Sequence, residues 1–231
     1  MGSTRLPGKV LKEAAGKPLL ALLLERLARA RTLDSIVVAT STDPRDDEIA
    51  SLCGRLGVPV FRGSEMDVLD RYVQAAREFD FEVVVRVTAD CPLIDPELVD
   101  EMVRFFLENR GRFDLVTNRH PLTYPDGLDF DVLPREALER AGREATAPHH
   151  REHAVPFFWE TGMRVHNVVD PENRFRRHRW TLDYPEDYEL IRRIVEALDR
   201  DGEHFGTRDI LAFLEKNPEL SSLNARYIPS E

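Results

Sequence analysis

The chain has 231 residues, 42 acidic and 32 basic, and a formal net charge of −10. This length suits one α/β domain, or one domain with an inserted lobe, and is ample for a buried core. Nucleic acids and anionic membranes recruit basic surfaces, so we expect neither as a partner. The two cysteines, Cys53 and Cys91, lie far apart without C-x-x-C spacing. They indicate neither a disulfide framework nor a zinc site, and a reducing cytoplasm fits them best.

The chain opens with a basic segment that contains two glycines, MGSTRLPGKVL (1–11). Glycines let backbone N–H groups approach a phosphate closely, and Arg5 and Lys9 supply positive charge. Lys9 is followed by Val10, so the segment is not a Walker A loop, and a G-x-G-x-x-G fingerprint is also absent. From the residues alone, the segment is either a phosphate-binding loop or a flexible, solvated terminus.

Helical and strand patterns alternate along the first half of the chain. The apolar run in PLLALLLERLARA (18–30) is short and is followed at once by charged residues, so it predicts an amphipathic helix rather than a signal peptide. Apolar, β-branched runs predict strands, and apolar residues at every third or fourth position predict helices. We expect strands at 35–40, 58–63 and 81–90 and helices at 43–57, 66–79 and 95–111. This order predicts an α/β fold with a mostly parallel sheet.

The alternation breaks in the second half of the chain. Between about 119 and 170 we expect a small inserted lobe, with a short helix near 135–142 and a strand at 164–169. A strand, a tight turn and a long helix over 178–198 then return to the core, and 207–218 predicts a last helix. The expected organisation is therefore one domain with parts 1–118, 119–170 and 171–231.

Two aspartates stand where parallel sheets place their ligands. Asp90 stands at the end of the strand segment expected at 81–90, and Asp183 lies at a second strand end, before a turn and helix. Two carboxylates from separate strands suit Mg²⁺ bridged to substrate phosphates. The alternative is that these segments supply helix caps, with Asp90 or Asp95 before one helix and Asp183 or Asp187 before the next.

Seven segments together resemble one family. The chain resembles the cytidylyltransferases, in the branch of spore-coat polysaccharide biosynthesis, which is related to the CMP-sialic acid and CMP-Kdo synthetases. The resemblance covers nearly the whole chain and is carried, in the family's order, by GSTRLPGK, VVATSTDP, RGSEMDVLDRY, VRVTADCPLIDP, YPDGLDFDV, REHAVPFF and RWTLDYPEDYELI.

The resemblance implies a three-layer nucleotide-diphospho-sugar transferase fold, similar to that of the glycosyltransferase-A enzymes. It implies a cytoplasmic, Mg²⁺-dependent enzyme that converts CTP and a sugar or sugar acid into a CMP-sugar and pyrophosphate for surface polysaccharide. It also implies a homodimer, with 1–118 as the nucleotide-binding half and 119–170 as a lobe for sugar binding or dimerisation. Such chemistry depends on alignment and charge neutralisation.

The resemblance also implies roles for particular residues. Catalysis would fall to Arg5, Lys9 and Asp90, and Asp90 and Asp183 would coordinate Mg²⁺. The residues implied to bind the nucleotide are Ser3, Arg5 and Lys9 at the triphosphate and Thr40, Ser41, Arg62, Ser64 and Asp70 at the base and ribose.

For the sugar, the resemblance points to YPDGLDFDV and RFRRHRW. Arg177 or Arg179 would pair with a sugar carboxylate, and Asp126 and Asp129 would face the sugar. The alternatives are an arginine-rich solvent face of a strand and an ordinary tight turn around Gly127.

Two further groups of reactive side chains have simpler explanations. His149, His150, His153 and Glu152 share a helical stretch and suggest a metal site, but packing, a dimer contact or a sugar contact explains them more simply. Cys91 beside Asp90 is most simply a small buried side chain rather than a catalytic thiol.

The chain departs from the family in two places. Family members carry an apolar strand and an arginine ahead of the phosphate loop, whereas this sequence begins at the loop. We expect a truncated start; the alternatives are that another chain supplies the strand or that the protein is impaired. The segment TADCP also differs from the more acidic or amide-bearing segment of the sugar-acid synthetases, which weakens the transfer of substrate identity. The competing hypotheses are a glycosyltransferase that uses Asp129–Asp131 as a D-x-D motif, and a non-catalytic relative.

Overall fold

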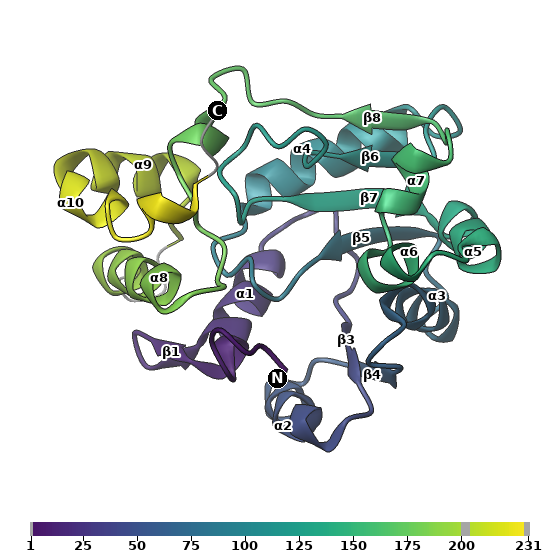
Figure 1. Ribbon diagram of the computed structural model, residues 1–231, viewed down its shortest axis with the longest axis horizontal. Coiled ribbons are helices and arrows are strands. Elements are labelled where there is room, and N and C mark those ends of the chain that lie inside the picture. The colour runs from purple at the N-terminus through teal and green to yellow at the C-terminus, as the bar shows by residue number, and fades with distance from the viewer. Residues whose placement is uncertain (1, 200–203, 229–231) are drawn as a thin grey trace.

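The computed structural model describes residues 2–199 and 204–228, which form an α/β fold with helices packed around the strands (Figure 1). The longer helices are α1 (Leu19–Leu27), α2 (Asp47–Leu56), α3 (Val68–Glu78), α4 (Pro96–Glu108), α5 (Arg135–Glu144), α8 (Pro185–Leu198) and α9 (Thr207–Lys216). The shorter ones are α6 (Pro148–His153), α7 (Pro156–Glu160) and α10 (Pro218–Ser221), with 3₁₀ turns at Lys9–Leu11, Pro44–Asp46, Arg174–Arg176 and Ala225–Tyr227. The strands are β1 (Glu13–Ala14), β2 (Lys17–Pro18), β3 (Val38–Ser41), β4 (Val60–Gly63), β5 (Val83–Val87), β6 (Leu115–Thr117), β7 (Phe130–Pro134) and β8 (Val165–Asn167).

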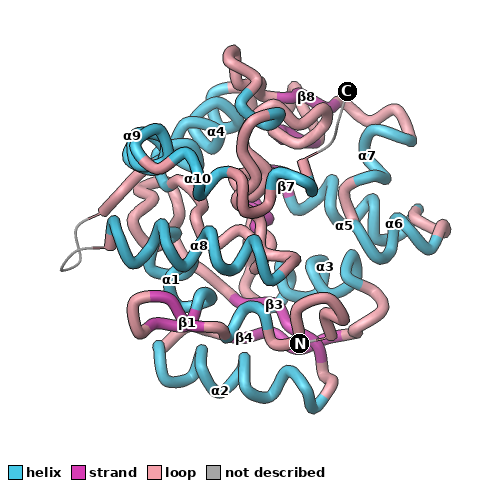
Figure 2. Tube along the Cα trace, turned by 60° about the vertical axis from the view of Figure 1, so that its left-hand side comes forward, coloured by secondary structure: helices cyan, strands magenta, loops and turns pink. Residues whose placement is uncertain are grey.

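The strands of the described residues form three sheets. The largest has the order β5-β7-β6-β8, in which β7 runs antiparallel to both neighbours and β6 and β8 are parallel. β3 and β4 form a separate parallel pair, and β1 and β2 form a small antiparallel hairpin. α8 lies against this hairpin (Figure 2), where the Tyr188 hydroxyl donates a 2.7 Å hydrogen bond to the carbonyl of Glu13.

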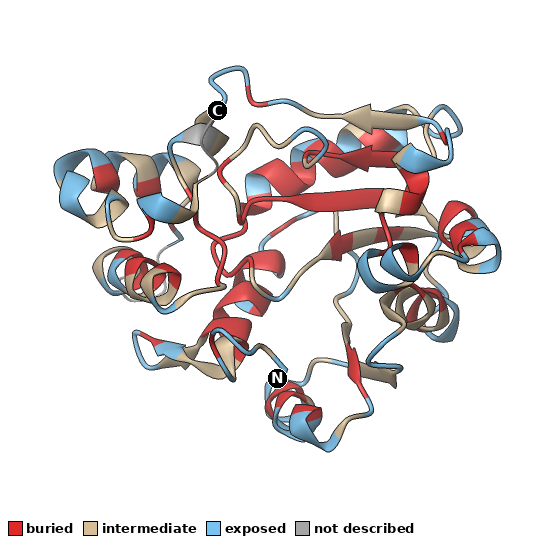
Figure 3. Ribbon diagram, viewed as in Figure 1, coloured by how far each residue is buried: buried red, intermediate tan, exposed pale blue. Residues whose placement is uncertain are grey.

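Two apolar cores cover the two faces of the large sheet. Val116 and Val132 belong to a core shared with α1, α4 and α8, whereas Leu115 and Leu133 belong to a second core shared with α3, α5 and α7. Neighbouring residues of a strand point to opposite faces, so this alternation places the cores on either side of the sheet. The buried interior along β6, β7 and α4 is visible in Figure 3.

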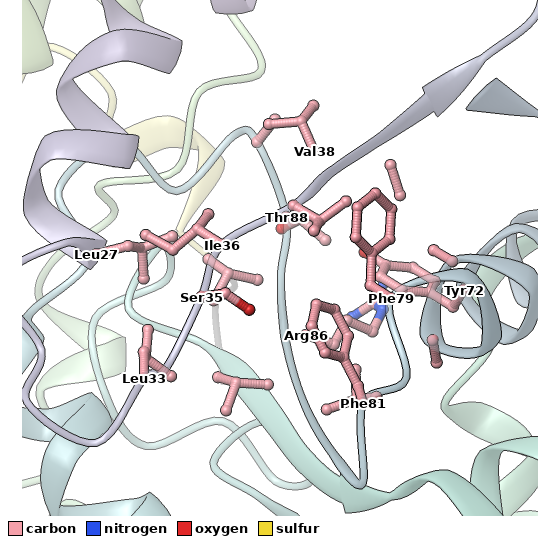
Figure 4. Close-up of a pocket in the computed structure, with 18 of the residues that line it drawn as sticks. Leu27, Leu33, Ser35, Ile36, Val38, Tyr72, Phe79, Phe81, Arg86 and Thr88 are labelled. Atoms are coloured by element: carbon pink, nitrogen blue, oxygen red, sulfur yellow. The ribbon is translucent and has the colours of Figure 1, made fainter. Parts of the chain in front are cut away.

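A cleft separates β3 from β5. The two strands do not pair, and a cavity of about 860 Å³ lies between them. Leu27 and Ile36 line one side of it and Tyr72, Phe79 and Phe81 the other (Figure 4). No strand among the described residues fills this space. Many of its lining residues are apolar, and apolar surroundings are typical of a buried parallel strand. A strand ahead of the phosphate loop remains a prediction.

Several expected elements differ in detail. The strand expected at the start of 178–198 is instead an extended segment with one isolated β-bridge, between Arg179 and Asp126. Its amides bond to turns, since the N–H of Trp180 donates to Asp126 O (2.6 Å) and that of Leu182 to Asp90 O (2.9 Å). The sequence pattern did not indicate β6 and β7, which form the middle of the large sheet and are largely buried there.

Candidate active site

Lys9 lies between two carboxylates that are distant in sequence. Its Nζ is 2.9 Å from Asp90 Oδ2 and 2.9 Å from Asp183 Oδ1. Gly8, in the left-handed conformation (φ 64°), precedes the 3₁₀ turn that begins at Lys9. Asp90 follows β5, and Asp183 lies just before α8. The structure thus brings together the two predicted metal ligands and the predicted phosphate-binding lysine.

The charges of this group support one another. Burial opposes the charge of Lys9, but Asp90 and Asp183 outweigh it and hold the pKa of the ammonium above its ordinary value. Burial likewise opposes the charge of Asp90, yet Lys9 and a hydrogen bond from Thr88 hold the pKa of this carboxyl below its usual range. Both groups are therefore ionised at neutral pH.

The two helix caps are made by other aspartates. Asp95 accepts a 2.9 Å bond from the N–H of Glu97 at the start of α4, and Asp187 accepts one of 3.0 Å from the N–H of Tyr184 at the start of α8. The capping role that the sequence left open thus falls to Asp95 and Asp187, and both Asp90 and Asp183 face Lys9.

Arg5 reaches the same group from the solvent side. One of its terminal nitrogens donates a 2.9 Å hydrogen bond to the Tyr184 hydroxyl, and the other lies 3.6 Å from Asp183 Oδ1. Its guanidinium lies 4.7 Å from the centre of the Tyr184 ring, which in turn stacks on Tyr227 at 3.8 Å. Tyr184 was not singled out from the sequence, because nothing in the pattern shows that its ring supports a residue 179 positions away.

Arg179 and Asp126 extend the group towards the lobe. Arg179 contacts three carboxylates, at 2.5 Å (Asp126), 3.2 Å (Asp183) and 3.1 Å (Asp187). Burial and the nearby charge of Asp129 raise the pKa of Asp126 to about 7, against the opposing effect of Arg179, and Asp183 and Asp90 add to the rise. Arg179 is therefore shared among three carboxylates, and Asp126 lies beside a further one, Asp129.

Asp129 also lies in this region. It accepts a 3.1 Å hydrogen bond from the N–H of Gly127 and lies 3.6 Å from Arg119. Asp131, two residues on, is fully buried and is satisfied by Arg86 (2.9 Å) and the Thr117 hydroxyl (2.7 Å). These partners occupy the second carboxylate of the D-x-D pattern, which removes the observation that favoured a glycosyltransferase.

The predicted base and ribose residues divide into two groups. The hydroxyls of Thr40 (2.8 Å) and Ser41 (2.6 Å) both donate to Asp46, and Arg62 donates to the carbonyl of Ser41 at 2.8 Å. These residues meet at the carboxyl ends of β3 and β4. Asp46 was missed because its role depends on this meeting of two segments.

The remaining predicted residues lie elsewhere or have local partners. Ser64 accepts a hydrogen bond from the N–H of Asp67, whose own carboxylate accepts one from the N–H of Asp70, so these residues shape the start of α3. Ser3 accepts a local bond from the N–H of Leu6 and lines the cleft. Arg177 is exposed and contacts the carbonyl of Glu172 rather than the group around Arg179.

Cys91 is not an activated thiol. Its sulfur lies 3.9 Å from both Asp90 Oδ1 and Asp129 Oδ1. Burial, together with these carboxylates, holds the pKa of the thiol well above its usual value. Since the thiolate is the nucleophile, Cys91 acts as a small buried side chain.

Nucleotidyl transfer requires positive charge at the phosphates and carboxylates that can hold a cation, and this structure brings both together beside the end of β5 and the start of α8 in an α/β fold. These features fit a nucleotide-binding transferase. The family model described as cytidylyltransferase matches residues 1–215. The chain belongs to the cytidylyltransferase family.

Individual relatives agree with this assignment. The chain is 37% identical to an uncharacterized protein of Methanocaldococcus jannaschii, over 97% of this chain and 90% of the relative. It is 33% identical to the spore coat polysaccharide biosynthesis protein SpsF of Bacillus subtilis, over 96% and 93% of the two chains. A solved structure of a cytidylyltransferase from Leptospira borgpetersenii is 33% identical to the chain, with a TM-score of 0.89; the match covers 95% of this chain and 92% of that one.

The fold is that of the nucleotide-diphospho-sugar transferases. No helix in the described parts of the chain is long and apolar enough to cross a membrane.

Proposed function

We propose that this cytidylyltransferase is Mg²⁺-dependent and transfers CMP from CTP to a hydroxyl of a sugar or sugar acid, with release of pyrophosphate. The observation that carries the proposal is the placement of Lys9 between Asp90 and Asp183. The relative named for spore coat polysaccharide biosynthesis supports surface polysaccharide as the destination of the product. A cytoplasmic homodimer belongs to the same proposal and rests on the family resemblance.

The residues around Lys9 fit a magnesium ion. Asp90, Asp183 and Asp126 offer only carboxylate oxygens, which hard cations prefer. Burial is the main cause of the raised pKa of Asp126, and the charges of Asp129, Asp183 and Asp90 add to it. Asp90 and Asp183 would hold the ion, which when bound supplies charge neutralisation to the triphosphate and to the leaving pyrophosphate.

The chain's own side chains divide the remaining tasks. Lys9 and Arg5 would bind phosphate oxygens, and Tyr184 holds Arg5 in place through its ring and hydroxyl. In the transfer, the sugar oxygen bonds to the α-phosphorus as the bond to pyrophosphate breaks, and the hydroxyl proton must pass to a base. Asp126 suits that role because its pKa is about 7 and it lies on the lobe side of the group.

Nucleotide binding tests the first half of the proposal. CTP, UTP, ATP and GTP are compared by thermal shift, each with and without Mg²⁺. A ligand at about 100 times its dissociation constant adds roughly 2.7 kcal/mol, which raises the Tm of a domain of this size by several degrees. We expect a shift with CTP that Mg²⁺ increases. A larger shift with UTP would contradict the nucleotide assignment.

Catalysis tests the second half, by pyrophosphate release from CTP with a panel of sugars and sugar acids. We expect Asp183→Asn to abolish turnover while the protein stays folded, because an amide is a poor Mg²⁺ ligand. Asp80→Asn is the matched control, since that side chain is 89% exposed and pairs only with Arg135 in the described structure. Near-normal turnover in Asp183→Asn would remove Asp183 from the mechanism.

A further inference from the structure

Three metal-binding side chains converge at the edge of the molecule. His149 and His150 lie on α6, and Glu160 is the last residue of α7. The Nε2 atoms of the two histidines are 2.8 Å and 2.7 Å from the same oxygen, Oε2 of Glu160. The donor atoms of all three side chains lie within 4.8 Å of one another. The sequence pattern pointed to His153 and Glu152 as partners of the two histidines, whereas the structure supplies Glu160.

The convergence depends on a strained turn. α6 has six residues and α7 five, so neither helix is stable alone. Ala154 joins them with φ 63° and ψ −62°, and the N–H of Val155 bonds to the carbonyl of His153 at 2.8 Å. This is a classic-type γ-turn, which is rare and strained for a residue with a Cβ. It folds α7 back so that its last residue meets the first turn of α6.

Burial fixes part of the group and leaves part open. The side chain of His150 is 11% exposed and packs edge-on against Phe157, with the ring centres 5.5 Å apart. The side chains of His149 and Glu160 are 51% and 44% exposed. A cation can therefore reach a preformed group from solvent.

We propose that His149, His150 and Glu160 form a zinc site that joins α6 to α7, separate from the carboxylates around Lys9. Two imidazole nitrogens and one carboxylate oxygen are ligands typical of Zn²⁺, whereas Mg²⁺ takes oxygen ligands. The proton that each Nε2 shares with Glu160 moves to Nδ1 or to solvent, so that both nitrogens offer a lone pair. Bond lengths of about 2.0–2.1 Å separate tetrahedral donors by roughly 3.3 Å, so each histidine nitrogen needs to move only about half an ångström from Oε2 of Glu160.

The position gives the site a structural role. Arg151 of α6 pairs with Asp67, which caps α3, and its side chain also bonds to the carbonyl of Gly142 at the end of α5. A zinc ion that fixes α7 to α6 would therefore also stabilise the contacts of α6 with α3 and α5.

The test uses the full chain after treatment with a chelator, titrated with Zn²⁺ in a calorimeter and with Co²⁺ in an absorption cell. We expect one equivalent of Zn²⁺ to bind, the Tm to rise, and Co²⁺ to give the intense visible bands of a four-coordinate site. His149→Ala and Glu160→Gln should each weaken binding by tenfold or more. Both positions are half-exposed, so the variants are expected to stay folded.

His153→Ala is the matched control, because His153 lies on the same helix outside the group. Equal weakening by His149→Ala and His153→Ala would show diffuse surface binding and overturn the proposal. Weak Co²⁺ bands typical of six ligands, or no stoichiometric binding, would overturn it as well. These readouts need neither CTP nor a sugar, so they stand apart from the test of the enzymatic activity.

Discussion

Gly127→Ala tests how closely the turn before β7 approaches the segment that carries Asp183. Gly127 has φ 105°, and a Cβ placed there would lie 2.5 Å from the amide nitrogen of Thr181 and 2.5 Å from the carbonyl carbon of Trp180. Ordinary contacts of this kind begin at 3.4 Å. The obstructing atoms are backbone, so a rotamer change cannot relieve the overlap. We expect the strain of the positive φ, ~1–3 kcal/mol, and the overlap, ~1–3 kcal/mol, to add to about 4 kcal/mol.

Urea unfolding and a thermal scan measure this effect. At roughly 2–4 °C per kcal/mol, the Tm should fall by about 8–16 °C. Gly54→Ala is the control, because Gly54 lies inside α2 with nothing within 4 Å of an added Cβ. This control should gain ~0.5–1 kcal/mol from helix propensity. A loss below about 1 kcal/mol in Gly127→Ala would refute the close approach of these two segments.

Three further predictions concern charge and the cleft. The pKa of Asp126 is raised to about 7 from 3.8, so between these pH values the native state binds more protons than the unfolded state. The free energy of unfolding should therefore fall as pH rises through that window, by no more than ~4 kcal/mol. Asp126→Asn should flatten this dependence in urea titrations at pH 5 and pH 8; an unchanged slope would show that another group is responsible. Arg86→Met should lower the free energy of unfolding by about 3–5 kcal/mol, because it leaves Asp131 buried without its 2.9 Å partner. The double variant with Asp131→Leu should recover much of this stability. No recovery would mean that loss of the ion pair is not the cause of the destabilisation. An apolar extension of about six residues at the amino terminus should enter the cleft as a strand and raise the Tm by roughly 5 °C or more. A Gly/Ser extension of equal length should leave the Tm unchanged. Equal Tm values for the two extended chains would contradict strand addition.

The pairing of Asp90 with Asp183 was accessible from the sequence, because both were expected at strand ends, where an α/β sheet places its ligands. The sequence pattern alone left the Lys9 segment as either a phosphate loop or a solvated terminus, so the place of Lys9 beside them came from the family resemblance. In the structure Lys9 contacts both carboxylates, although Asp183 lies on an extended segment rather than on a strand.

The partners of the other predicted residues were less accessible. Arg179 was expected on a strand. Its segment is instead held by hydrogen bonds from the N–H groups of Trp180 and Leu182 to carbonyls of two turns, which places Arg179 beside Asp126, 53 residues earlier in the chain. Glu160 joins the histidines only because Ala154 adopts a strained conformation that no local preference predicts. In both cases the deciding contact is made by tertiary packing, which overrides local propensity.

The cleft between β3 and β5 also affects the heat capacity of the molecule. Its apolar walls, which include Val83, Val85 and Val87, are only partly buried in the folded chain. Unfolding then hydrates less apolar surface than in a closed α/β domain of this length, so the heat capacity change of unfolding is smaller. The stability curve of the chain is correspondingly flatter with temperature, and covering these walls would make it steeper.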